Sequence, residues 1–559
     1  MPALPRYREA YGTAGGCRME KNESECARRA VTGEGRVYGF FMVPPRGGIM
    51  ENDGHKDAAP EGADPLDRAA LSRFGIPYLL PYQKLVIAGI LEAAEELNAA
   101  ATGGGAEALR EDREGLGRRV VIFPTGAGKS LCFQIPALFL DGITLVIYPL
   151  LALMADQARR LSEQGIPCAL LRGGQSAEER QAQWEKLRAG GVRILIANPE
   201  ILLTQAARKQ LATLRVAHLV FDEAHCVSEW GETFRPSYLA VREIIEAAGT
   251  AQVSAFTATA SEAVLEKIRA RIFGEEGART VIANPDRPSI AYAALGCVLP
   301  DRAVREVLAG SGRPALVFCA SRTGTETLAR YLRSGTGDRE IRFYHAGLEK
   351  REKTALEDWF FQSRRGVLTA TCAYGMGMDK PDIRTVIHRD CPPSVEAYLQ
   401  ESGRAGRDGN AARAVLLFGP DDRRRLGRDG AGDARERRLK LMEYARNTGE
   451  CRRDALLRLL DYRGGHGAPH YACCDVCAGT ARAGHREAAA LIPFFRRNRR
   501  RYTIAEASRV LSSGGAAPLF SRNEAFEAVL GLLETGELKR LGGLFWKDKI
   551  MVSGKEFSG

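Results

Sequence analysis

The stretch FPTGAGKS, residues 123–130, decides the fold. It ends a short, mostly apolar run that begins at Arg119 and has the length and composition of a buried strand. Gly126 and Gly128 can adopt positive φ, which lets backbone N–H groups approach an anion closely. Residues 131–135 read as a helix whose positive N-terminal end would face that anion. Strand, glycine-containing loop and helix in this order predict a phosphate-binding loop in an α/β fold.

This loop departs from the strict pattern G-x-x-x-x-G-K-[ST], because Phe123 occupies the first glycine position. The side chains that bind phosphate and magnesium are nevertheless present. Lys129 supplies a point charge for the β- and γ-phosphates, and Ser130 supplies a hydroxyl for magnesium. A strand-to-helix turn that binds nothing is the alternative, and two glycines followed by GKS argue against it. The expected nucleotide cradle is Thr125, Gly126, Ala127, Gly128, Lys129 and Ser130.

Composition limits the class of protein. The chain has 559 residues, enough for three to five domains of ~100–200 residues, and 45% of them are apolar. No stretch reaches the ~18 uncharged apolar residues of a membrane span, and the charged N-terminus is unlike a signal peptide. We therefore expect a cytoplasmic protein, nucleoid-associated if bacterial, with no membrane partner. The net charge of +11 suits a polyanionic partner, and nine of the 13 cysteines are scattered singly, as expected of reduced thiols.

Two series of apolar segments alternate with helical segments. Near-continuous apolar strands separated by helices predict a parallel sheet covered on both faces. Because only the first series carries a phosphate loop, a nucleotide can sit between two α/β domains in tandem. The expected strands are 119–123, 144–148, 193–197, 217–221 and 252–256 in the first domain, and 314–318, 341–344, 366–370, 385–388 and 414–418 in the second.

The domain limits follow from this alternation. Residues 66–290 are expected to form the first α/β domain, with a Gly- and Ala-rich loop insertion at about 97–118, and residues 291–420 the second. Residues 1–65 are rich in Gly, Pro and charge without periodicity, which predicts a disordered leader. An over-long reading frame with Met50 as the true start is the alternative.

The sequence FDEAH (221–225) ends one of the predicted strands. Asp222 can hold the magnesium shell together with Ser130, and Glu223 can polarise the attacking water. The four-residue motif DEAH can occur by chance, but its position after an apolar strand and downstream of GKS favours a catalytic role.

These motifs resemble those of the RecQ family of DNA helicases, in superfamily 2. The family's first motif, which need not open with glycine, is similar to FPTGAGKSLCFQIPAL (123–138). The resemblance covers roughly residues 70–480 and implies two RecA-like motor domains. The other motifs follow in family order as YPLLALMADQ (148–157), LVFDEAHCVSEWGETFRPSY (219–238), SAFTATA (254–260), TATCAYGMGMDKPDIR (369–384) and YLQESGRAGRDG (398–409).

The resemblance also implies residue roles. Lys129, Asp222 and Glu223 would be catalytic in the first domain. Arg404 and Arg407 in the second domain would include an arginine finger, with Arg407 the better candidate. A finger acts only when the domains close, so hydrolysis would be coupled to domain motion. A solvated arginine pair on a helix is the alternative.

An aromatic-rich segment directly follows DEAH. A helical core stripe is one interpretation, but Gly231 and Pro236 would interrupt a helix. Aromatic faces stack on bases, and Arg235 can contact a phosphate. The segment resembles the family's sensor that couples DNA contact to hydrolysis, so Arg235 and two of the aromatic residues, Trp230 and Phe234, are expected to bind DNA. The aromatic residues at spacings of four are Trp230, Phe234 and Tyr238.

The segment FGIPYLLPYQ (74–83) resembles the family's adenine-reading motif, in which Gln83 would bond the adenine edge. It departs from the family at Leu80, where arginine is usual, and at Tyr82, where glycine is usual. We expect Tyr82 or Tyr78 to stack on the base.

A group of cysteines lies late in the chain, in a subdomain expected at 421–480. Four thiolates suit tetrahedral structural zinc. The adjacent pair departs from C-x-x-C, and the more common family spacing would put a ligand at Tyr471, although some members use a neighbouring pair. His470 is the reserve ligand, and buried free thiols are the alternative. The expected zinc ligands are Cys451, Cys473, Cys474 and Cys477.

Residues 481–559 are expected to form a winged-helix-like DNA-binding domain, which in this family would grip duplex DNA and part its strands with the wing. A basic helical tail without function is the alternative. The signals are a basic run at 496–501, capping boxes at 503–506 and 521–524, a helix ending near Gly536, and a hairpin at 538–541 and 544–552.

These features predict an ATP-dependent DNA helicase, with 3′ to 5′ polarity implied by the resemblance, acting in DNA repair or recombination with ATP, Mg²⁺ and Zn²⁺. Expected partners are single-stranded DNA, duplex junctions and a single-strand-binding protein. An RNA helicase of the same superfamily is one alternative, which ATPase stimulation by DNA or by RNA would decide. A non-catalytic DNA-binding scaffold is the other, which an absence of DNA-stimulated hydrolysis would establish.

Overall fold

The computed structural model describes two compact units, Met1–Pro285 and Asp286–Gly559. They divide close to the predicted boundary after residue 290, and each has its own sheet and hydrophobic cores. Among the described helices, none is long and apolar enough to cross a membrane. The described residues are 37–40, 64–101, 115–124, 126–229, 237, 240–274, 277–375, 380–428, 432–462, 464–513, 520–543 and 545–553.

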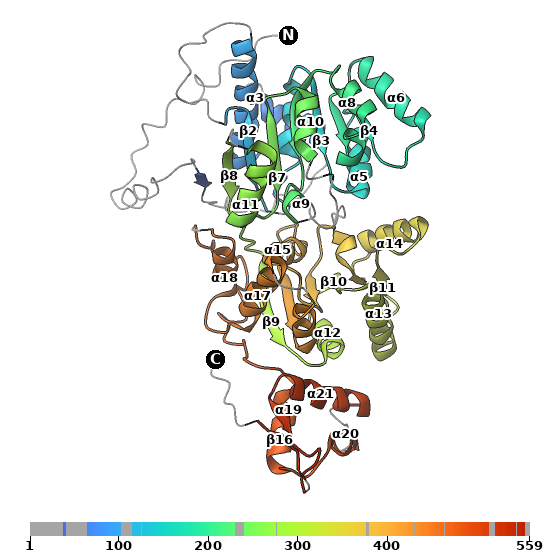
Figure 1. The fold of residues 1–559 in the computed structure, drawn as a ribbon, viewed down its shortest axis with the longest axis vertical. Coiled ribbons are helices and arrows are strands. Elements are labelled where there is room, and N and C mark those ends of the chain that lie inside the picture. Colours follow the sequence, from blue (N-terminus) through green and yellow to red (C-terminus); the bar gives the residue numbers. More distant parts are fainter. Residues whose placement is uncertain are drawn as a thin grey trace, which may run out of the picture. The chain divides into compact units, whose positions relative to one another are not determined.

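The first unit contains an eight-stranded parallel sheet in the order β1-β8-β2-β7-β6-β3-β5-β4 (Figure 1). The five strands predicted for this domain are confirmed to within one residue at each end, whereas β1, β4 and β8 were missed. The strands are β1 (Val37–Phe40), β2 (Arg118–Ile122), β3 (Ile143–Ile147), β4 (Cys168–Leu171), β5 (Ile194–Ala197), β6 (Val216–Phe221), β7 (Val253–Thr257) and β8 (Arg279–Ala283).

Both faces of this sheet are buried, as near-continuous apolar strands require. Val120 and Ile122 of β2 enter one core, whereas Val121 and the following Phe123 enter the other. The core of Val121 is covered by α2 (Pro65–Phe74), α3 (Pro81–Ala101), α4 (Leu131–Phe139) and α5 (Leu151–Glu163). The core of Val120 is covered by α6 (Ala177–Arg188), α7 (Pro199–Leu202), α8 (Gln205–Leu211), α9 (Cys226–Glu229), α10 (Val241–Ala248), α11 (Glu262–Ile268) and the π-helical turn η3 (Arg269–Phe273).

Two predicted loop regions contain regular structure. Helix α3 continues to Ala101, so the predicted insertion at about 97–118 begins as helix, which its alanine run favours. Within the predicted leader, Val37–Phe40 forms β1, which pairs in parallel with β8. The rest of the leader before Asp64, and residues 102–114, lie outside the described residues.

The second unit contains a six-stranded parallel sheet in the order β11-β12-β10-β13-β14-β9. The five predicted strands are present, and β9 was missed. The strands are β9 (Ile290–Gly296), β10 (Ala315–Phe318), β11 (Ile341–Tyr344), β12 (Val367–Ala370), β13 (Thr385–His388) and β14 (Ala412–Phe418). One core contains α12 (Pro300–Ala309) and α13 (Arg322–Thr336); the other contains α14 (Lys350–Gln362), the 3₁₀ turn η5 (Cys372–Gly375), α15 (Val395–Ser402), α16 (Pro420–Leu426), α17 (Asp433–Arg446) and α18 (Arg452–Leu459).

The cysteine loop extends the edge of this second sheet. The backbone N–H of Tyr292 in β9 donates to Cys473 O at 3.2 Å, and the N–H of Asp475 donates to Tyr292 O at 3.0 Å. Cys474 is 4% exposed and belongs to the same core as the strands. The cysteine region therefore covers the otherwise unpaired edge of β9.

The C-terminal region contains the two predicted capped helices and a hairpin, preceded by a helix that was not predicted. The second hairpin strand covers only Ile550–Val552, whereas 544–552 was expected. The elements are α19 (Ala488–Arg497), α20 (Ile504–Ser513), α21 (Arg522–Glu534), β15 (Leu538–Arg540) and β16 (Ile550–Val552), with β15 and β16 antiparallel. Both predicted capping boxes are present, through Thr503 with Glu506 and Ser521 with Glu524. These helices share a core with Val298, two residues after the end of β9.

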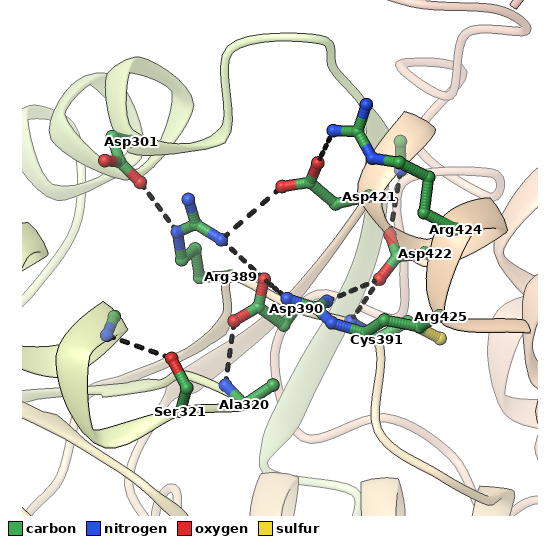
Figure 2. A network of polar contacts seen from close by, with 12 residues as sticks. Asp301, Ala320, Ser321, Arg389, Asp390, Cys391, Asp421, Asp422, Arg424 and Arg425 are labelled. Atoms are coloured by element: carbon green, nitrogen blue, oxygen red, sulfur yellow. Dashed lines mark hydrogen bonds and ion pairs between the residues drawn. The ribbon is translucent and has the colours of Figure 1, made fainter. Parts of the chain in front are cut away.

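A polar network lies at the carboxyl ends of β10, β13 and β14. Figure 2 shows the guanidinium of Arg389 between three carboxylates, and the distances are 2.6 Å to Asp301, 2.6 Å to Asp390 and 3.9 Å to Asp421. Asp390 also pairs with Arg425 at 2.8 Å. This network borders a cavity of about 730 Å³ whose other wall is α21, so it connects the second motor sheet to the C-terminal helices.

Candidate nucleotide and metal sites

The loop after β2 has the backbone that anion binding requires. Gly126 and Gly128 have φ of 83° and 72°, in the region that favours glycine. Lys129 donates from Nζ to Phe123 O at 3.2 Å, and Ser130 directly precedes α4. The ring of Phe123 is fully buried in the core, which accounts for an apolar residue at the first pattern position. Thr125 lies outside the described residues.

The adenine-motif glutamine contacts this loop directly. Gln83 Nε2 donates to Ala127 O at 2.9 Å, and Gln83 Oε1 accepts from the Leu80 N–H at 2.8 Å. A Cβ at position 128 would lie 2.4 Å from Gln83 Nε2, so glycine is also needed there for this close approach. Of the two stacking candidates, Tyr82 is 8% exposed and Tyr78 is 54% exposed. Tyr78 is therefore the ring that can offer a free face to a base.

The two DEAH carboxylates follow β6 in the same unit. Asp222 is 8% exposed. Burial and the charge of Glu223 raise the pKa of Asp222, Lys129 opposes both effects, and the net pKa is about 7. Glu223 has a φ of 51°, and its N–H donates to Asp222 Oδ1 at 3.0 Å. The three predicted catalytic residues of the first domain are thus electrostatically coupled.

The histidine of DEAH is tied to the strand end that carries SAFTATA. Thr257 donates from Oγ1 to Thr259 O at 3.0 Å, so it accepts from His225 Nδ1 at 3.1 Å. His225 Nδ1 also lies 3.4 Å from Glu223 Oε2. Sequence analysis placed both threonines in the SAFTATA motif but assigned no role to either; Thr257 is the last residue of β7.

The predicted finger arginines lie in the turn that follows α15 in the second unit. Arg404 is 5% exposed and Arg407 is half-buried. The carbonyl oxygens of this turn accept from Arg287, which sequence analysis missed. The expected DNA-binding residues Trp230, Phe234 and Arg235 lie outside the described residues.

The four predicted zinc ligands converge. One ligand atom from each of Cys451, Cys473, Cys474 and Cys477 lies within 4.8 Å of the others. The Sγ atoms of Cys451 and Cys473 are 3.5 Å apart, and those of Cys451 and Cys474 are 3.9 Å apart. Such a set of thiols fits a tetrahedral divalent metal.

Backbone groups favour the thiolate form at this cluster. The N–H groups of Arg452 and Cys477 each donate to Cys474 Sγ at 3.4 Å. Burial raises the pKa of Cys474, but these two N–H groups, together with hydrogen bonds from the thiols of Cys477 and Cys451, outweigh it and the net pKa is lowered. The reserve ligand His470 is not in the cluster. His466 is the imidazole that groups with Cys451 and Asp454.

Comparison with protein families agrees with this geometry. A family model for DEAD/DEAH box helicases matches residues 81–268, and one for the helicase conserved C-terminal domain matches residues 300–409. The two parallel sheets and the phosphate loop therefore belong to a two-domain helicase motor.

Comparison with individual proteins identifies which family of helicases this chain resembles. The chain is 36% identical over 367 residues to ATP-dependent DNA helicase RecQ of Pasteurella multocida, covering 64% of this chain and 57% of that protein. It is 37% identical over 308 residues to the probable ATP-dependent DNA helicase RecS of Bacillus subtilis, covering 54% and 61%. The chain spans about three fifths of the length of these two relatives. It belongs to the RecQ family of helicases.

Solved structures support the fold alone. The DEAD-box helicase Mss116 bound to ssRNA and UDP-BeF has a TM-score of 0.50 at 20% identity, covering 66% of this chain and 76% of that chain. The DUF1998 helicase MrfA bound to DNA also has a TM-score of 0.50, at 17% identity, covering 90% and 60%.

Proposed function

We propose that this chain is an ATP-dependent DNA helicase that moves 3′ to 5′ along single-stranded DNA and separates duplexes in repair or recombination. The observation that carries the proposal is the coupling of Lys129, Asp222 and Glu223 around one phosphate loop. The names of its RecQ relatives support DNA as the substrate.

Each predicted nucleotide-site side chain of the first unit has a role in this proposal. Lys129 contacts the β- and γ-phosphates, Ser130 and Asp222 hold Mg²⁺, and Glu223 orients the attacking water. Bound Mg²⁺ would neutralise charge on the phosphates. The adenine edge is read by Gln83, whose second Nε2 hydrogen and Oε1 can meet the base while the first hydrogen bonds Ala127 O.

The arginine pair of the second unit completes the reaction. Arg407, with Arg404 beside it, acts as the finger that stabilises charge on the γ-phosphate when the domains close. Trp230, Phe234 and Arg235 contact the single strand, and this contact is coupled to the DEAH residues that catalyse hydrolysis. Trp230→Ala is accordingly expected to abolish DNA stimulation of hydrolysis while nucleotide binding stays intact.

A basic groove in the second unit supports a polyanionic partner. The groove has a volume of about 1290 Å³ and lies between the linker before α19, the helix itself and the C-terminal hairpin. Its one acidic lining residue, Glu537, accepts from His485 Nδ1 at 2.7 Å. The lining cations that have no ion-pair partner among the described residues are Arg482, Arg496, Arg499 and Lys539. Contacts from these cations to phosphates would be independent of sequence.

The four cysteines would hold Zn²⁺ and tie the cysteine loop to β9. A duplex junction and a single-strand-binding protein are the further proposed partners. Binding to DNA would bring the protein to the nucleoid if the chain is bacterial.

The test compares ATP hydrolysis with single-stranded DNA, with RNA and without nucleic acid, together with strand displacement on 3′-tailed and 5′-tailed duplexes. We expect DNA to stimulate hydrolysis at least ~tenfold and the 3′-tailed substrate to be unwound. Preferential stimulation by RNA would replace the proposal with the RNA-helicase alternative. An absence of stimulation would establish the scaffold alternative.

A further inference from the structure

The linker that follows the first unit contacts the turn that carries the arginine pair. Arg287 is the second residue of the second unit. Its Nη1 donates to Gly403 O at 2.8 Å, and its Nη2 donates to Ala405 O at 3.2 Å and Gly406 O at 3.4 Å. One guanidinium thus holds three carbonyl groups on either side of Arg404.

Helix α15 ends at Ser402, so the carbonyl groups of Gly403, Ala405 and Gly406 lie beyond the hydrogen-bonding pattern of the helix, and Arg287 supplies donors to them. Gly406 has a φ of 55°, and a Cβ there would lie 2.7 Å from Asn410 O, so the backbone path is tightly defined. Guanidinium is planar with five donors in fixed directions, whereas a lysine ammonium is a compact point charge. Arginine is therefore the residue type that suits three carbonyls at once.

The backbone that carries Arg287 is itself anchored. The neighbouring carboxylate of Asp286 accepts from Arg453 Nε at 2.8 Å and from the Gly467 N–H at 3.0 Å. The side chain of Arg453 is 1% exposed. On the other side of Arg287, the His470 N–H donates to Pro288 O at 3.0 Å. The cysteine region thus fixes the linker, and the linker fixes the arginine turn.

We propose that Arg287 is a positioning residue for the arginine finger: it holds the turn that bears Arg404 and Arg407 in the conformation from which Arg407 acts. This inference rests on the proposed function. The finger has to meet a charge that develops in the transition state, and a displacement of ~1 Å can lower a rate ~100-fold. Loss of Arg287 should therefore reduce turnover rather than nucleotide binding.

The test uses Arg287→Ala and Arg287→Lys in the full chain, with Arg242→Ala as the matched control. Arg242 also caps a helix end, donating to Ala270 O at 2.9 Å and Arg271 O at 3.3 Å, but in the first unit. We expect Arg287→Ala to lower the DNA-stimulated kcat ~10- to 100-fold with the KM for ATP within about twofold of wild type. Arg287→Lys should retain an intermediate kcat, and Arg242→Ala should retain the wild-type kcat.

A second measurement does not depend on activity. Amide hydrogen exchange in a peptide that spans 399–410 should become at least ~tenfold faster in Arg287→Ala and stay unchanged in Arg242→Ala. Unchanged exchange in Arg287→Ala overturns the inference, even if the wild-type protein lacks DNA-stimulated hydrolysis and the proposed function has failed. In an active protein, a kcat within twofold of wild type, or a kcat loss that Arg242→Ala shares, also overturns it.

Discussion

Gln83 donates through Nε2 to the carbonyl oxygen of Ala127 at 2.9 Å, and this bond joins the adenine motif to the phosphate loop. The other end of the same amide accepts from the backbone of Leu80. The segment predicted to read the base and the phosphate loop are therefore joined by a hydrogen bond in the first unit.

Gln83→Ala should weaken ATP binding and reduce the preference for ATP over GTP. Loss of the amide removes the proposed contact to adenine, and the KM for ATP should rise ~tenfold, which corresponds to ~1.4 kcal/mol. Steady-state kinetics with both nucleotides measures the effect. Gln134→Ala is the control, because Gln134 lies on α4 and donates to Gln157 at 3.1 Å. An unchanged ATP-to-GTP ratio in Gln83→Ala would remove adenine reading from this residue.

Asp390 should contribute to stability at neutral pH. Burial alone raises the pKa of Asp390, but Arg389 and Arg425 outweigh it, so the net pKa lies below its ordinary value (Figure 2). A carboxyl with a lowered folded pKa stabilises the fold above its unfolded pKa, and that contribution is lost as pH falls through the folded value. The window therefore lies below about pH 4.

Asp390→Asn should lower the free energy of unfolding by about 3 kcal/mol at pH 7, because it removes the buried carboxylate that two partly buried arginines, Arg389 and Arg425, share. The effect should shrink below pH 4. Asp421→Asn is the control: Asp421 is 37% exposed and lies 3.9 Å from Arg389, so its loss should change the free energy by less than ~1 kcal/mol. Urea unfolding across pH measures both, and equal effects would contradict the account.

Cys474→Ser should lower the zinc content per chain at least ~tenfold, because it removes one of the four converging thiols, whose Sγ lies 3.9 Å from Cys451 Sγ. Elemental analysis after dialysis measures the metal. Cys391→Ser is the matched control, since Cys391 is a buried thiol in the same unit outside the cluster. Full zinc occupancy in Cys474→Ser would exclude this residue as a ligand.

Arg496→Glu should weaken DNA binding and reduce the dependence of log K on log salt by about one unit, because one phosphate contact is lost. Its neighbour Arg497 is exposed but does not line the groove, which makes Arg497→Glu the matched control. Fluorescence anisotropy with a tailed duplex at several salt concentrations measures the DNA affinity of both variants. Equal losses would mean that net charge, rather than this groove, determines affinity.

Periodicity predicted strands that are mostly apolar, and it failed where packing overrides local preference. Strand β9 contains three alanines and a glycine, which favour other structures, yet it pairs with β14 on one side and contacts the cysteine loop on the other. Strand β8 begins with arginine and threonine. Strand β4 is as short and apolar as the predicted β10, so its length does not explain why it was missed.

The candidate sites were predictable where side-chain types carry the chemistry, as at Lys129 and the four cysteines. They were not predictable where a side chain donates to a distant backbone carbonyl. The bonds from Gln83 to Ala127 and from Arg287 to Gly403 connect positions 44 and 116 residues apart. A carbonyl oxygen is present at every residue, so the sequence contains no pattern that marks the accepting position.

The most direct test of the account is the rate of ATP hydrolysis by wild type and by Arg407→Ala at saturating single-stranded DNA, with nucleotide affinity measured in parallel. The account predicts strong DNA stimulation in the wild type. It also predicts a kcat in Arg407→Ala that is lower by ~10³-fold, with affinity within about threefold. A wild-type kcat in the variant, or a loss explained entirely by weaker nucleotide binding, would contradict it.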